Sequence, residues 1–131
     1  MQNSAIRRTR RANRRILRAR VTARAAAQRL AASCRRRPRS LATVAVASGV
    51  AKGTVTGVTN GLRSVAKRLG LAPAEQARTK RTVAGGRGHR IRAVAHWTLG
   101  QVRVLLAAYK PRKAEYVAAV ALIAAFAGVS A

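Results

Sequence analysis

The chain has 131 residues and carries 28 lysines and arginines against two acidic residues, so its formal net charge is +26. This length allows at most one domain with appendages. Two carboxylates, two histidines and one cysteine provide no acid–base pair, triad or metal cluster in the sequence, so we expect no enzyme activity, no catalytic or metal-binding residues and no cofactor.

The net charge predicts a polyanionic partner, because a protein this basic repels itself unless anions neutralise it. DNA, or another polyanion, is the commonest such partner, and an anionic membrane surface is the alternative. A high-GC coding sequence would also enrich arginine and alanine without a functional reason. We therefore expect a non-enzymatic DNA-binding protein of the cytoplasm, with attachment to the inner face of the membrane as the alternative.

Residues 1–39 contain 14 arginines, no lysine and no acid. The charges surround a helix drawn through this segment, so we expect a disordered arm that becomes helical on a polyanion. Guanidinium groups donate bidentately to phosphate oxygens. An organelle-targeting peptide has a similar composition and is the alternative. The candidate nucleic-acid-binding residues of the arm are Arg7, Arg8, Arg10, Arg11, Arg14, Arg15, Arg18, Arg35, Arg36 and Arg37.

Cys34 is the only cysteine, which excludes an intramolecular disulfide. The arginines that follow it would lower its thiol pKa, but we expect an incidental free cysteine.

Residues 40–83 are predicted to form a helix-turn-helix-like unit. Ser40 is positioned to start the first helix, on which Val44 and Ser48 share one face. Gly49 can adopt the positive φ that a sharp turn between helices needs. Val50 would then fill the gap between the two helices.

The second helix of this unit would run from Lys52 to Asn60. Val55 and Val58, three residues apart, face inward, whereas Lys52 and Thr56 fall on the outward face together with two glycines. In a helix-turn-helix the second helix presents its outward side chains to the DNA major groove. Lys52 and Thr56 are therefore candidate DNA contacts.

The run V-A-x-x-S-G-V-A-x-x-T-V-T-x-V-x-N-G, residues 44–61, resembles the headpiece of the lactose-repressor family. Downstream, residues 66–73 and 77–79 resemble the end of that headpiece's third helix and the hinge helix that enters the minor groove. The resemblance would make residues 62–69 a separate third helix of two turns. Over residues 44–81 the resemblance implies a DNA-binding helix-turn-helix. Gly53 and Gly57 stand where the family places base-reaching side chains, so we expect a weak sequence preference.

A different interpretation of the same stretch rests on four glycines with a spacing of four residues: Gly49, Gly53, Gly57 and Gly61. Small residues at this spacing let helices approach closely in a membrane. These glycines would then be helix-packing residues of a basic membrane protein that forms a homo-oligomer. The layout of the chain also resembles small basic spread and transfer proteins of plasmids. Chance patterning in an Ala-, Val- and Gly-rich chain is a third interpretation.

After the central stretch, Gly70 predicts a left-handed helix cap with Leu71 folded back on the last turn. Pro73 is expected to begin another helix, in which Arg78, Lys80 and Arg81 are further candidate nucleic-acid-binding residues. That helix should end at a Gly-rich linker, residues 84–89.

Residues 90–131 are expected to contain two helices. The apolar residues of residues 90–109 recur with a helical period and predict an amphipathic helix, which Pro111 ends. Residues 116–131 carry no charge and form a hydrophobic helix that either spans a membrane or packs against the preceding helix. The predicted fold is therefore all-α, with an arm (1–39), a helix-turn-helix-like unit (40–83), a linker (84–89) and a C-terminal helix pair (90–131).

Overall fold

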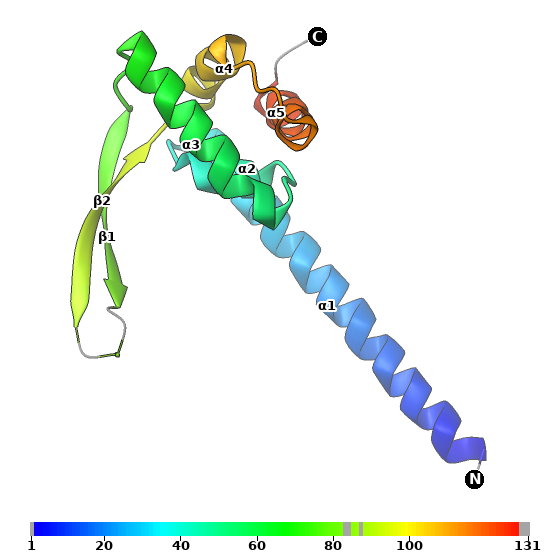
Figure 1. Ribbon diagram of the computed structural model, residues 1–131. Coiled ribbons are helices and arrows are strands. Elements are labelled where there is room, and N and C mark those ends of the chain that lie inside the picture. The colour runs from blue at the N-terminus through cyan, green and yellow to red at the C-terminus, as the bar shows by residue number, and fades with distance from the viewer. Residues whose placement is uncertain (1, 83–84, 87, 129–131) are drawn as a thin grey trace. The chain divides into compact units, whose positions relative to one another are not determined.

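The structure, a computed structural model, describes residues 2–82, 85–86 and 88–128. Within this part the chain is mostly helical and contains one two-stranded antiparallel sheet, so the all-α prediction fails for the segment that forms the sheet. Figure 1 shows the elements in chain order: α1 (Gln2–Arg36), α2 (Leu41–Ala47), α3 (Lys52–Leu69), β1 (Glu75–Thr82), β2 (His89–His96), α4 (Leu99–Ala108) and α5 (Ala114–Ala127).

The chain divides into two compact units, Met1–Leu30 and Ala31–Ala131. The described part of the first unit is helical throughout and nearly all of its side chains are exposed. The sequence predicts disorder here until a polyanion binds, whereas the structure shows the helical state. The second unit contains the end of the predicted arm, residues 31–39. It also contains the predicted helix-turn-helix-like unit, the linker and the C-terminal helix pair.

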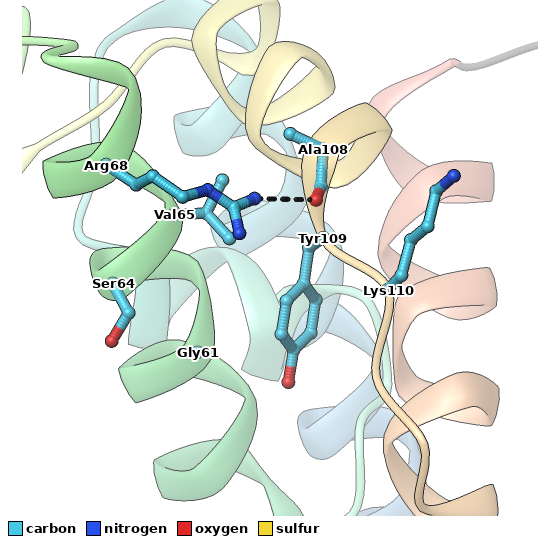
Figure 2. Close-up of a pocket in the computed structure, with 7 residues that line it drawn as sticks. All are labelled: Gly61, Ser64, Val65, Arg68, Ala108, Tyr109 and Lys110. Carbon is cyan, nitrogen blue, oxygen red and sulfur yellow. Dashed lines mark hydrogen bonds between the residues drawn. The ribbon is translucent and has the colours of Figure 1, made fainter.

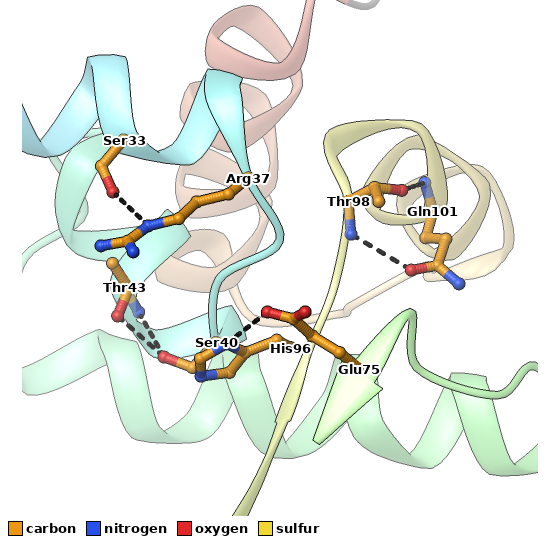
Figure 3. Close-up of polar contacts among 8 residues, drawn as sticks. All are labelled: Ser33, Arg37, Ser40, Thr43, Glu75, His96, Thr98 and Gln101. Atoms are coloured by element: carbon orange, nitrogen blue, oxygen red, sulfur yellow. Dashed lines mark hydrogen bonds and ion pairs between the residues drawn. The ribbon is translucent and has the colours of Figure 1, made fainter. Parts of the chain in front are cut away.

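The core of the second unit lies among α2, α3, α4 and α5. The predicted helices on either side of Gly49 are present. The hydroxyl of Ser40 accepts a hydrogen bond from the Thr43 amide at 3.2 Å, which caps the start of α2 (Figure 3). Gly49 has a φ of +85°, and Val50 is buried behind the turn, as the sequence predicts. The largest fully buried side chains are those of Val44, Val58, Leu62, Val102, Leu105 and Ile123.

Helix α3 is one helix of 18 residues, whereas the sequence predicts a break near Asn60 and a short third helix after it. Its apolar stripe runs without interruption from Val58 through Leu62 to Val65, so burial of this face holds the helix together across Gly61. The predicted stop is present. Gly70 has a φ of +66°, and the Leu71 amide donates to the carbonyl of Ala66 at 3.0 Å.

Residues 75–82 and 89–96 pair as an antiparallel β-hairpin, so the predicted helix from Pro73 and the hinge helix implied for residues 77–79 are absent. Cationic and apolar residues alternate along Arg90–Ile91–Arg92, which is the period of a strand. The described glycines of the connection have positive φ: Gly85 +103°, Gly86 +75° and Gly88 +155°. Residues 84 and 87 of the predicted linker lie outside the described part.

The base of the hairpin is joined to the helices by one more pair of backbone hydrogen bonds. The Arg39 amide donates to the Trp97 carbonyl at 3.1 Å, and the Trp97 amide donates to the Arg39 carbonyl at 2.8 Å. The Trp97 side chain is buried in the core. Helix α4 begins immediately afterwards, because Thr98 and Gln101 form a reciprocal capping box (Figure 3). The predicted helix over residues 90–109 is therefore wrong in its first half.

Helix α5 packs against α3 and α4 (Figure 1), and its Ala119 and Ile123 side chains are buried in the core. Residues 129–131 of the predicted hydrophobic helix lie outside the described part. No helix among the described residues combines the length and the hydropathy that crossing a membrane requires.

Burial of Cys34 gives a test of this core. Burial raises the pKa of its thiol, while the charges of Arg39 and Arg35 lower it. The thiolate is the reactive form, so iodoacetamide should modify the folded protein on the order of 100-fold more slowly than the protein in denaturant. Mass spectrometry over time measures both rates. Equal rates would mean that Cys34 is not part of the core.

Candidate nucleic-acid interface

The outward face of α3 is a row of polar and cationic side chains. Its members recur every three or four residues, so they share one side of the helix, and all of them are exposed: Lys52, Thr56, Asn60, Arg63 and Lys67. The Arg63 guanidinium donates to the Asn60 side-chain oxygen at 3.1 Å. We call these five residues the α3 outer face.

Only the first two residues of the α3 outer face are predicted from the sequence. Asn60, Arg63 and Lys67 were missed because the helix was expected to end near Asn60. The signal was present, since the outward spacing that links Lys52 to Thr56 continues to Lys67 in the sequence.

The four candidate helix-packing glycines have different surroundings. Gly49 forms the turn, and Gly53 faces open space, with no atom within 4 Å of the place a Cβ would occupy. At Gly57 a Cβ would lie 2.6 Å from Cζ of Tyr116, and at Gly61 it would lie 2.6 Å from Cζ of Tyr109. Gly57 and Gly61 thus admit two tyrosines of the same chain against α3.

These tyrosines are partly buried and come from the end of α4 and the first turn of α5. Burial raises the pKa of the Tyr109 hydroxyl, and the nearby Tyr116 raises it further. The phenol is therefore neutral at physiological pH. The Lys113 ammonium lies 5.5 Å from the centre of the Tyr116 ring, within cation–π range.

The hairpin carries cations on both of its faces. Partners in the register lie on the same face, so Arg78, paired with Ala93, and Lys80, paired with Ile91, share one face, while Arg92, paired with Thr79, lies on the other. Arg81 pairs with Arg90 in the register. The side chains of Arg78, Lys80, Arg90 and Arg92 are exposed, and Ile91 is 63% exposed.

The arginines predicted in residues 1–39 fall into two groups. Those from Arg7 to Arg18 are exposed on α1 within the first unit. In the second unit the Arg35 guanidinium lies 5.1 Å from the centre of the Phe126 ring, and Arg37 donates to the Ser33 hydroxyl at 3.3 Å (Figure 3). Arg36 is exposed at the end of α1. Of the predicted arm arginines, Arg35 and Arg37 therefore have an intramolecular contact, whereas Arg36 and those from Arg7 to Arg18 are exposed to solvent.

The chain's acids lie apart from the cations of the α3 outer face. Glu75 faces His96 across the base of the hairpin, with 3.6 Å between Oε1 and Nδ1 (Figure 3). Glu115 lies in the first turn of α5, where the helix dipole favours an anion. In the part of the chain that the structure describes, no three His, Cys, Asp or Glu residues gather as metal ligands would.

Comparison of the chain with protein-family models, with curated proteins and with solved structures gives no match.

Alanine at two glycines of α3 should have opposite effects on the free energy of unfolding. Gly53→Ala should raise it by about 0.5–1 kcal/mol, because the site is open and alanine favours a helix. Gly61→Ala should lower it, because moving the Tyr109 ring costs about 1–3 kcal/mol, more than the gain in propensity. Urea unfolding measures both. An increase for Gly61→Ala would show that Tyr109 does not pack there.

Proposed function

We propose that residues Ala31–Ala131 form a DNA-binding domain that places α3 in the major groove and the hairpin on the flanking backbone. The order of elements from the end of α1 is helix, single-residue bridge at Arg39, helix, turn, helix and hairpin. In this proposal α2 and α3 act as a helix-turn-helix, and the hairpin that follows them contacts the backbone beside the groove. The hairpin replaces the hinge helix that the lactose-repressor resemblance implies.

One observation carries the proposal: the exposed row of the α3 outer face follows a tight turn from α2. The turn at Gly49 lets α2 pack across the inner side of α3 through Val44 and Val58. The opposite side of α3 is exposed and holds three cations and two polar side chains that can hydrogen-bond to base edges or phosphates.

The hairpin supports the same function. Its base is anchored by Trp97, but the residues from Arg78 to Lys80 and from Arg90 to Ala93 are exposed and contribute nothing to the core. A two-stranded hairpin is marginal in water by itself. A basic one gains stabilising contacts when it lies along a phosphate backbone.

The two glycines near the start of α3 limit base readout. Gly53 is exposed beside Lys52 and Thr56 but has no side chain, and Gly57 lies under Tyr116. Base contacts specify sequence whereas phosphate contacts supply affinity. We therefore propose that affinity comes mainly from phosphates and that sequence preference depends on Lys52, Thr56 and Asn60.

The α3 outer face is tested by charge-matched variants. Arg63→Ala should weaken binding to duplex DNA about tenfold, as loss of one charged contact does. The control, Arg103→Gln, loses the same charge from α4, where the Arg103 side chain donates to the Ala127 carbonyl at 2.6 Å. Fluorescence anisotropy at one fixed salt concentration measures both. Equal losses would show that net charge, not the α3 outer face, determines binding.

The N-terminal unit is proposed to add phosphate contacts. Removal of residues 1–30 leaves Cys34 and Arg39 in place, so the second unit should fold without them. If about six of the removed arginines contact phosphates, a fourfold rise in salt weakens the full chain roughly a thousandfold more than the shortened chain. Titrations at several salt concentrations give the two slopes. Parallel slopes would exclude the arm as a nucleic-acid-binding segment.

The rival proposal is a basic membrane protein that oligomerises. The exposed apolar side chains of Val117 and Leu122 on α5 favour it. The occupation of Gly57 and Gly61 by tyrosines of the same chain speaks against a glycine zipper on α3. Leu122→Glu should leave DNA binding unchanged if the DNA-binding proposal is right. Loss of sedimentation with anionic vesicles in the same variant would support the rival.

A further inference from the structure

A pocket of about 550 Å³ opens between the C-terminal half of α3 and the end of α4 (Figure 2). Its walls come from Gly61, Val65 and Arg68 on one side and from Tyr109 and Lys110 on the other. All of them belong to the Ala31–Ala131 unit. The volume falls within the range of about 300–1,000 Å³ that is usual for small-molecule sites.

The charged groups among the residues that line the pocket are cationic, and the neutral Ser64 hydroxyl donates to the carbonyl of Asn60 at 3.0 Å. Arg68 donates from Nη2 to the carbonyl of Ala108 at 3.1 Å, which fixes one edge of its guanidinium (Figure 2). A guanidinium has five N–H donors, so this bond leaves capacity for a carboxylate or phosphate. The Lys110 side chain points away from Arg68 (Figure 2), and no acid is among the described residues that line the pocket.

The remaining wall is apolar and partly flat. Val65 is buried beneath the pocket, and the Tyr109 ring lies against the backbone of Gly61. Because burial keeps the Tyr109 hydroxyl protonated, as its raised pKa indicates, this wall adds no negative charge that would repel an anion. An inorganic anion would leave the ring and Val65 uncovered, whereas an anion with a planar apolar body covers them.

We propose that this pocket binds a small organic anion with a flat apolar body, of the aromatic carboxylate class, with its carboxylate on Arg68 and its ring against Tyr109 and Val65. An Arg68 fork accepts a carboxylate bidentately. The inference does not depend on DNA binding, since none of these residues belongs to the α3 outer face.

The test uses the full chain with 2-naphthoate as the probe and methyl NMR of Val65 and Ala108 as the readout. About 0.15 M salt screens the distant charges of the chain. Naphthoate should shift both methyl signals saturably, and the neutral 2-naphthamide should not. Inorganic phosphate, which matches the charge without the apolar body, should bind at least about tenfold more weakly.

Variants locate the site. Arg68→Gln should weaken naphthoate binding about tenfold or more, as loss of a charged hydrogen bond does, while Arg78→Gln on the hairpin removes the same charge and should leave binding unchanged. Arg68→Lys provides a second test: it keeps the cation but loses the bidentate fork, so it should weaken naphthoate binding less than Arg68→Gln does. Naphthoate shifts that spread over the chain and persist in both pocket variants, or equal binding of phosphate, would overturn the proposal.

Discussion

Burial of α3 on two of its sides determines how the rest of the Ala31–Ala131 unit is arranged. Val58 and Leu62 close the core against the neighbouring helices, and the edge at Gly57 and Gly61 is covered by tyrosines. One side remains in solvent, and it carries the cations and amide that we assign to DNA. Because the same helix forms the core and the proposed interface, a change that tilts α3 disturbs both.

Charge is the second constraint on this unit. With two acids in 131 residues, the protein has few opportunities to neutralise its cations internally, and Glu75 is directed to His96. The structure leaves most cations exposed, where water screens them. Some cations have a neutral partner in the same unit. Arg35 lies over the Phe126 ring, and Arg68 donates to the Ala108 carbonyl. A polyanion that neutralises the exposed cations would therefore stabilise the fold as well as bind it.

The sequence predicts features that depend on single residues with strong local preferences. Gly49 at the turn, Ser40 at the start of α2 and Gly70 at the end of α3 all lie where backbone chemistry requires them. The sequence does not predict the hairpin, because the apolar residues within 90–96 fit a helical period and a strand period almost equally. Pairing with residues 75–82 decides for the strand. The sequence does not predict the contacts that form the pocket, Tyr109 against Gly61 and Arg68 with Ala108, because they depend on tertiary packing.

The hairpin and the pocket are held in place by different contacts. The hairpin is tied to residue 39 by the Trp97 bridge, at the start of the unit, whereas the tyrosines hold α3 near its middle. A ligand beside Tyr109 would act on the second contact and leave the first in place, so any coupling between the pocket and DNA must pass through the position of α3 relative to the hairpin. Bulk at Gly61 would displace the Tyr109 ring that lines the pocket, and it would change DNA binding only if α3 moved with the ring.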